Sequence, residues 1–381
     1  MPNQPIPSIE SHFSELPDPR TDKSRIRHQL LDMVVIAICA VICGADSWVA
    51  VESFGHAKSK WLSRLLKLPN GIPSHDTFSR VFGLIDSIAF ERCFINWIKQ
   101  VIEVTDGQVV AVDGKHLRRS YDNSTDHGAI HLVSAWASAQ SVTLGQLKVA
   151  AHSNEIPAIP PLLELLTLSD CIVTIDAMGC HPPIAQQIVD GDADYVLALK
   201  ANQGQLYEDV KLLFDGILDN QLPDVQTDTA QTIDGDHGRI ETRTAITVAD
   251  PALIAPLRGS QTFVNLNSVV KVTAQREHKG HTTVKSRYYL SSLPGEADQL
   301  LNAIRTHWSI ENSCHWVLDV AFDEDRCRIR KENGSQNFAI IRRIALNLLK
   351  GEKSAKVGVA TKRLKAAWDT DYLITVLSTL F

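Results

Sequence analysis

The chain has 381 residues, of which 44% are hydrophobic and 22% charged. This composition is that of a folded globular protein and excludes a disordered or fibrous one. The formal net charge of −6 excludes a protein that binds nucleic acid over its whole surface, so any such binding must come from local clusters of basic residues.

The spacing of the cysteines and the length of the apolar segments indicate the cellular compartment of the protein. Seven cysteines without a Cys-x-x-Cys pair argue against a disulfide framework and against a structural zinc site. The N-terminus lacks the layout of a signal peptide, and the longest apolar run, Met33 to Cys43, is too short to span a bilayer. We therefore expect a cytoplasmic protein with no membrane segment.

Helical patterns fill most of the first hundred residues. Residues 1–23 are rich in proline and polar residues, and we expect them to form a loose arm. Residues 24–104 are predicted to form an all-helical domain. Within it, LLDMVVIAICAVICGADSW is apolar nearly all round, as a buried helix would be. Residues 49–66, 74–82 and 90–103 show helical periodicity or capping signals.

Strands and helices alternate in the next part of the chain. The strand-like segments are QVVAVDG, HLVSAWAS, VTLGQLKVA, CIVTIDAMG and ADYVLALK, and two helical segments lie among them, which predicts a mixed α/β sheet. Residues of about 205–295 begin helical and then become β-branched and alternating, which indicates a β-rich insertion. The helical period returns at residues 298–322, 333–350 and 361–380.

Three carboxylates stand out. Two predicted strands end in an aspartate, Asp113 and Asp176, and sites in open α/β sheets form outside the carboxyl ends of strands. For either aspartate alone, a turn or helix-capping role remains an alternative. Glu311 lies among apolar residues, where a carboxylate is costly unless it is paired or holds a metal; a salt bridge to Arg305 or Arg342 is the alternative. Together the three carboxylates suit two hard cations bound through oxygen ligands.

A longer set of motifs surrounds these residues. AVDGKHLRRS, HLVSAWAS, SNEIPAIPPLL, TIDAMGC, DYVLALKANQ and HWSIENSCHWVLDVAFDED follow one another in this order, and with further matching stretches they cover residues 12–373 or so. In these motifs the chain resembles the DDE transposases of the ISAs1 family, which includes the H-repeat-associated proteins and belongs to an IS4-like superfamily. The acidic triad of that family falls on Asp113, Asp176 and Glu311.

The resemblance implies a fold and a domain organisation. It implies an α/β protein with an RNase H-like mixed-sheet catalytic core at residues 105–350, which contains the β-rich insertion. A small all-helical domain at residues 24–104 precedes this core, and a C-terminal helical tail at residues 351–381 follows it.

The resemblance also implies an activity. Such enzymes cut DNA at the ends of an insertion sequence and join the 3′-OH ends to target DNA by two-metal phosphoryl transfer. Asp113, Asp176 and Glu311 would be both the catalytic residues and the ligands of two Mg²⁺ ions, for which Mn²⁺ can substitute. The partners would be the terminal repeats of the element and the target DNA, and synapsis of two ends suggests a homodimer on DNA.

Basic residues near the predicted site are expected to bind the DNA backbone. Some follow a predicted strand end or the Glu311 helix directly, and His307 occupies the arginine position of the Tyr-Arg-Glu-Lys pattern found in related enzymes. For any one of them a solvated charged surface is the alternative. The predicted DNA-binding residues are Lys115, Arg118, Arg119, Lys200, Arg239, His307, Arg328 and Arg330.

Two other functions remain open at this point. The chain could be a catalytically inactive or domesticated DNA-binding derivative on the same fold, or a stand-alone metal-dependent DNA nuclease. Joined products would separate a transposase from a nuclease, and any cleavage would eliminate the inactive derivative.

Overall fold

A computed structural model describes residues 7–101, 107–120, 129–150, 153–236 and 238–378. The chain divides into two compact units that do not follow chain order. Unit 1 contains Met1–Glu103, Gly114–Asn154 and Glu311–Phe381, and unit 2 contains Val104–Asp113 and Glu155–Ile310. None of the helices in the described part of the chain combines the length and the apolar content that a membrane span needs.

Unit 1 is mainly helical. Its helices are α1 (Pro7–Phe13), α2 (Leu30–Ile42), α3 (Trp48–Ala57), α4 (Ser59–Leu62), α5 (His75–Leu84), α6 (Ser87–Val101), α12 (Trp316–Phe322), α13 (Gly334–Gly351), α14 (Val359–Trp368) and α15 (Thr370–Leu377). It also holds the antiparallel strands β2 (Ile130–Ala137) and β3 (Val142–Lys148). A π-helical turn, Glu311–His315, leads into α12.

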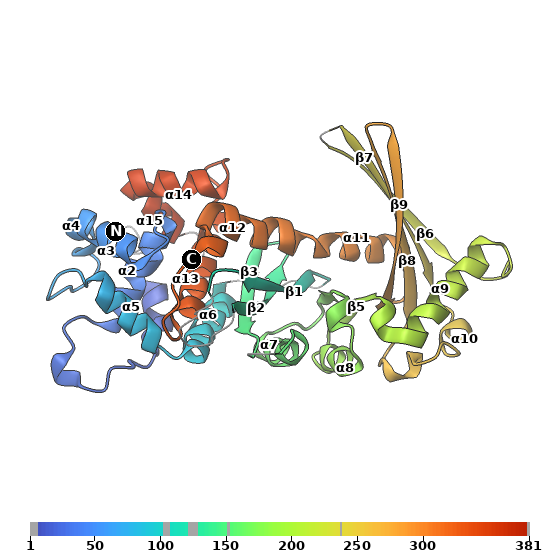
Figure 1. Cartoon of the computed structure of the whole chain (residues 1–381), viewed down its shortest axis with the longest axis horizontal. Helices are drawn as coiled ribbons and strands as arrows, with labels where there is room; N and C mark the ends of the chain where they lie inside the picture. Colours follow the sequence, from blue (N-terminus) through green and yellow to red (C-terminus); the bar gives the residue numbers. More distant parts are fainter. Residues whose placement is uncertain (1–6, 102–106, 121–128, 151–152, 237, 379–381) are drawn as a thin grey trace. The chain divides into compact units, whose positions relative to one another are not determined.

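Helices from both ends of the chain share the core of unit 1. Helix α2 is almost entirely buried, as its uniformly apolar sequence predicts, and it packs against α13 (Figure 1). The ring of Trp48 stacks on Phe82 with 4.7 Å between centroids and meets Phe338 of α13 edge-on at 4.9 Å. The C-terminal helices are therefore part of the same core as the N-terminal helices.

Helix α1 corrects the expectation of a loose arm. Ile9, Phe13 and Leu16 are buried, and the ring of Phe13 meets Phe90 of α6 edge-on at 5.6 Å. The apolar residues between the prolines thus fix this segment to the helical core. Residues 1–6 lie outside the described part of the chain.

Unit 2 is built on a sheet. Its strands are β4 (Ile172–Ile175), β5 (Asp194–Leu199), β6 (Asp228–Asp236), β7 (Arg239–Val248), β8 (Ser268–His278) and β9 (His281–Ser291), and β1 (Val109–Leu117) passes from unit 2 into unit 1 after Asp113. Its helices are α7 (Ile159–Leu165), α8 (Pro182–Asp190), α9 (Gly204–Leu218), α10 (Pro251–Ile254) and α11 (Ala297–His307). Short 3-10 turns occur in the two units at Lys23–Arg25, Ile156–Ala158, Ala177–Gly179, Ala201–Gln203, Ser260–Thr262 and Glu324–Arg326.

The strand order confirms the fold class predicted from the sequence. The nine strands follow the order β3-β2-β1-β4-β5-β9-β8-β7-β6. Strands β1, β4 and β5 are parallel, whereas β9 is antiparallel to β5 and begins the antiparallel β6–β9 insertion. This is the mixed sheet of an RNase H-like core, with its β-rich insertion placed before the helix that leads to Glu311.

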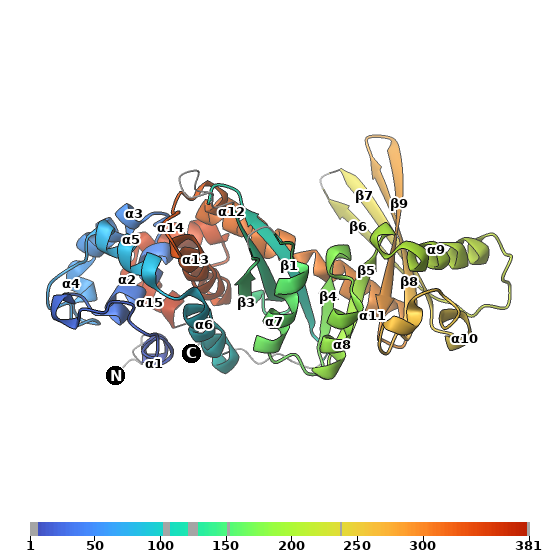
Figure 2. The ribbon, with the colours of Figure 1, turned by 60° about the horizontal axis from the view of Figure 1, so that its bottom comes forward.

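Helices cover both faces of the sheet in unit 2. Helices α7 and α8 lie on one face and α11 crosses the other (Figure 2). Strand β4 is buried along its whole length, as a parallel strand covered on both faces is expected to be. Helix α11 packs Leu300, Leu301 and Ile304 against the sheet, which fixes the end of α11 that precedes Glu311.

Candidate functional site

Asp113 and Asp176 follow equivalent positions on neighbouring parallel strands. The register pairs Val112 of β1 with Ile175 of β4, so each aspartate is the next residue after a paired position. The apolar segments VVAV and IVTI form these buried strands, and both aspartates are partly exposed. The backbones of Asp113 and Asp176 therefore follow directly on the last paired positions of β1 and β4 in unit 2, the region of a parallel sheet in which sites form.

Asp176 is also a helix cap. Its Oδ1 accepts hydrogen bonds from the backbone N–H groups of Met178 at 3.0 Å and Gly179 at 3.4 Å, and the residue caps the turn Ala177–Gly179. The capping role that the sequence left open is therefore present. Both bonds use one oxygen, so capping is compatible with a ligand at Oδ2.

Glu311 begins the π-helical turn that follows α11. Its side chain is 56% exposed, whereas the His315 side chain, four residues later, is 4% exposed. His315 Nδ1 is hydrogen-bonded to Glu311 Oε2 at 3.2 Å, and this bond lowers the pKa of Glu311 against the opposing effect of burial. A π-helical turn of this kind often marks a functional site.

The two arginines considered as salt-bridge partners of Glu311 have other partners in the structure. Arg305 pairs with Asp234 at 2.6 Å, and the guanidinium of Arg342 lies over the ring of Phe338 at 4.5 Å. The partner of Glu311 is His315, which the sequence analysis did not single out. Its spacing of four residues from Glu311 was the available signal, because residues four apart on a helix are neighbours.

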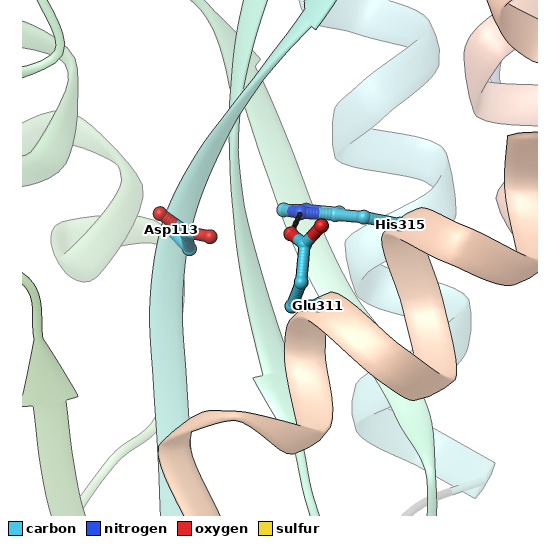
Figure 3. Close-up of side chains that lie close together, drawn as sticks. All are labelled: Asp113, Glu311 and His315. Atoms are coloured by element: carbon cyan, nitrogen blue, oxygen red, sulfur yellow. Dashed lines mark hydrogen bonds and ion pairs between the residues drawn. The ribbon is translucent and has the colours of Figure 1, made fainter. Parts of the chain in front are cut away.

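A group of three side chains includes two of the predicted carboxylates. Where β1 passes through Asp113, one ligand atom each of Asp113, Glu311 and His315 lie within 4.8 Å of one another. Figure 3 shows Asp113 on its strand and Glu311 and His315 on the helical segment. Two carboxylates and an imidazole are a donor set that a divalent cation can use.

Another carboxylate lies near Asp176. Glu155, in the SNEI motif, has its pKa raised to about 7 by burial and, secondarily, by the negative charge of Asp176. The sequence analysis quoted this motif but assigned no role to the glutamate, because its burial depends on residues distant in the chain. Unit 2 thus holds three carboxylates around this edge of the sheet.

The predicted DNA-binding residues differ in their surroundings. Lys115 is 7% exposed and its ammonium is bonded inside the protein, and His307 Nδ1 is hydrogen-bonded to Thr174 at 2.9 Å. Arg330 is partly exposed, and its Nε donates to the carbonyl of Arg119 at 3.1 Å. The exposed members of the set are Arg118, Arg119, Lys200, Arg239 and Arg328.

Comparisons with known proteins give a consistent result. The family model described as a transposase DDE domain matches residues 99–348, and the model of the DDE-associated region matches residues 10–98. The chain is 42% identical over 374 residues to "Putative transposase YncI" of Escherichia coli O157:H7, covering 98% of this chain and 95% of that protein. It is 38% identical over 377 residues to "H repeat-associated putative transposase YhhI" of Escherichia coli K12, covering 98% of each.

A solved structure was also matched. The piggyBac transposase in a synaptic complex with hairpin DNA gives a TM-score of 0.46 at 12% identity, covering 99% of this chain and 80% of that one. The family assignment depends on the sequence matches alone. The chain belongs to the transposases with a DDE domain, and among them it is related to the H-repeat-associated proteins.

Proposed function

We propose that this protein is an active transposase that cuts DNA at the ends of its element and joins the 3′-OH ends to target DNA. Asp113, Asp176 and Glu311 would act as the catalytic, metal-binding carboxylates. The main support is the register of β1 and β4, in which the residues just before Asp113 and Asp176 are paired, in a chain of this family. The reaction would take place in the cytoplasm, with a homodimer acting on the DNA.

The residues at this site fit a hard divalent cation such as Mg²⁺ or Mn²⁺. Their donors are carboxylate oxygens, which these cations prefer, and Asp176 keeps one oxygen outside its capping bonds. The lowered pKa of Glu311 favours its ionised, ligand-competent form. Two bound ions would stabilise the charges that develop on the attacking and leaving oxygens during phosphoryl transfer.

The protein's own contribution would be orientation. The hydrogen bond from His315 holds the Glu311 carboxylate in one orientation, as outer partners of metal ligands do. The exposed residues Arg118, Arg119, Arg328, Lys200 and Arg239 would bind DNA phosphates and position the scissile bond, without reading sequence. Lys115 is left out of this set because its ammonium is bonded inside the protein.

A cleavage and joining assay tests this function. The substrate is DNA that carries the flanks of the gene, with Mg²⁺ or Mn²⁺ added. Near-isosteric variants Asp113→Asn, Asp176→Asn and Glu311→Gln remove one ligand charge each, and we expect each to lower the cleavage rate by about 100-fold or more. Asp190→Asn, which changes an exposed carboxylate at the end of α8, is the matched control and should cut like the wild type.

The products separate the alternatives. Metal-dependent nicks at the element ends together with joined strands support a transposase. Nicks without joining would instead assign the chain to the metal-dependent nucleases. Folded protein that binds the ends and never cuts would make it an inactive or domesticated derivative, and cutting that survives all three substitutions would place the catalytic site elsewhere.

A further inference from the structure

Lys115 is a buried cation two residues after Asp113 on β1. Residues two apart on a strand point to the same face of the sheet, so Lys115 and Asp113 share a side of β1. The Lys115 ammonium donates to the carbonyl oxygen of His315 at 3.0 Å and contacts Asp319 Oδ1 at 2.5 Å and Glu324 Oε2 at 3.4 Å. An ammonium has three donors, so these contacts satisfy it.

His315 links Lys115 to Glu311 through two hydrogen bonds. Its carbonyl oxygen accepts the bond from Lys115 at 3.0 Å, and its ring is bonded to Glu311 Oε2 at 3.2 Å. Two hydrogen bonds thus lead from the β1 lysine to the Glu311 carboxylate. Asp319, four residues after His315 on α12, gives Lys115 a second attachment to the same helical segment.

The far end of this network is fixed in the core of unit 1. The side chains of Glu324 and Arg343 are both 0% exposed and lie 2.9 Å apart, and Arg343 also donates to the carbonyl of Ala339 at 3.1 Å. In this network Lys115 pairs with Asp319 and Glu324, and Arg343 pairs with Glu324. A buried charged network gives little net stability compared with apolar packing, so its presence favours a role in fixing geometry.

We propose that Lys115 is a positioning residue that holds the Asp113-bearing strand against the Glu311-bearing helical segment, through His315 and Asp319, and so sets the geometry in which a divalent cation binds. This role rests on the proposed function, because it concerns the same carboxylates. It replaces the DNA contact that the sequence predicted for this lysine.

Whether Lys115→Met strengthens or weakens the binding of a divalent cation distinguishes a positioning role of Lys115 from a purely electrostatic effect of its charge. Lys115→Met removes a positive charge near a cation site, and this change alone would strengthen binding of a divalent cation. If Lys115 positions the ligands, the same substitution weakens binding. Removing an outer partner of metal ligands typically costs about 10- to 100-fold in affinity, and we expect a loss of that order for Mn²⁺.

The experiment measures Mn²⁺ binding to the whole chain, without DNA, by electron paramagnetic resonance, next to thermal unfolding and cleavage. Lys362→Met is the matched control, because Lys362 is a buried lysine that donates to the carbonyls of Leu349 and Glu352 and pairs with the Glu352 carboxylate at 3.3 Å. We expect Lys362→Met to lose thermal stability and to keep the Mn²⁺ affinity of the wild type. Lys115→Met should lose both.

A second pair of variants applies if Lys115→Met does not fold. Asp319 is 34% exposed and Asp325 is 25% exposed, and Asp325 pairs with Arg118 instead of Lys115. Asp319→Asn and Asp325→Asn remove the same charge from the same region. We expect a several-fold loss of Mn²⁺ affinity in Asp319→Asn only, and equal affinities in the two variants would overturn the proposal.

The outcomes also distinguish this inference from the proposed function. Wild-type protein that cuts DNA, with Lys115→Met and Asp319→Asn binding Mn²⁺ as their controls do, would refute positioning and leave the transposase standing. Wild-type protein that binds Mn²⁺ through Asp113 but never cuts would refute the transposase, while the affinities of the variants still decide the role of Lys115. Binding of Mn²⁺ that is unaffected by Asp113→Asn would refute both.

Discussion

At the residue scale, Glu324 and Glu91 show how direct pairing with a cation lowers the pKa of a buried carboxylate. Burial alone would raise the pKa of Glu324, but the charge of Arg343 and then that of Lys115 outweigh it and lower this pKa to about 2. Glu91 of α6 is equally buried, and its Oε1 accepts a hydrogen bond from the backbone N–H of Gln146 at 2.9 Å. Burial raises the pKa of Glu91 to about 8.

This difference predicts a pH-dependent stability that depends on Glu91. Between its ordinary value of 4.5 and about 8, the folded state keeps a proton that the unfolded state has lost. The free energy of unfolding therefore falls as pH rises through this window, by on the order of a few kcal/mol. Glu91→Gln, which is neutral at every pH, should match the wild type near pH 5 and be the more stable protein at pH 8.

Urea unfolding at several pH values between 5 and 8 measures this effect. Glu208→Gln, an exposed position on α9, is the control and should keep the pH slope of the wild type. Parallel pH profiles for wild type and Glu91→Gln would show that Glu91 does not hold its proton in the folded state.

The sequence predicted the strands of the candidate site better than its internal contacts. Asp113 and Asp176 each follow a short apolar, β-branched run, and such a run indicates a strand. The end predicted at Asp176 is correct, because β4 ends at Ile175, whereas the end predicted at Asp113 is wrong, because β1 continues to Leu117. The burial of Lys115 had no comparable signal, because its partner Asp319 lies 204 residues further along the chain. A lysine next to two arginines after a strand is typical of an exposed basic patch, and only the packing of the segment after Glu311 makes it internal.

At the element scale, the start of α11 is fixed by the turn at Gly295. This residue has φ +99°, and a Cβ added to it would lie 2.7 Å from the Cβ of Ala249. The hydroxyl of Thr247, near the end of β7, donates to the carbonyl of Gly295 at 2.6 Å. The direction in which α11 leaves the sheet, and with it the approach to Glu311, depends on this close contact.

Gly295→Ala is therefore expected to be more destabilising than an ordinary glycine substitution. A left-handed backbone costs a non-glycine residue about 1–2 kcal/mol, and the overlap with Ala249 adds about 1–3 kcal/mol. Gly280→Ala is the matched control, because Gly280 in the β8–β9 turn has φ +75° with nothing within 4 Å of the added Cβ. Urea unfolding should show the larger loss at Gly295, and equal losses would mean that Ala249 moves aside freely.

The elements themselves were predicted unequally. Alternating, β-branched segments indicated the strands β7, β8 and β9 of the insertion, because each carries its own periodicity, whereas the largely polar β6 was not predicted. The π-helical turn Glu311–His315 was not predicted, since residues 298–322 keep a helical period on both sides of it. A π-helical turn changes the hydrogen-bonding partner and not the composition, so it leaves little trace in a hydrophobic pattern.

At the scale of the whole molecule, the order of the chain is a poor guide to its compact units. Helix α2 packs against α13, so residues near the two ends of the sequence complete one core. The family resemblance placed the helices up to residue 350 in the catalytic core, and helical periodicity alone shows that a helix has an apolar face without identifying its partner. Truncating either end would expose the apolar face of the other.

The charge of the whole molecule constrains how it could bind DNA. With a net charge of −6, long-range attraction to a polyanion is weak, and affinity must come from a few exposed cations at the site. Arg118 and Arg119 are exposed residues that follow the β1 strand. Under the proposed function they would bind phosphates, and each phosphate contact contributes to the salt dependence of DNA binding.

A double variant, Arg118→Gln with Arg119→Gln, tests this expectation. For duplex DNA the logarithm of the binding constant falls with the logarithm of salt concentration with a slope of about −0.9 per phosphate contact, so losing two contacts should make the slope shallower by about 2. The affinity should fall to a similar extent on element ends and on unrelated DNA, because phosphate contacts carry no sequence information. Lys23→Gln with Arg25→Gln, two exposed cations of the turn before α2, changes the net charge equally and should leave the slope unchanged.

The measurement is fluorescence anisotropy across a salt series. A wild-type slope in the first variant would remove these arginines from the DNA-binding surface, and equal losses in both variants would mean that net charge, not local contact, controls the binding.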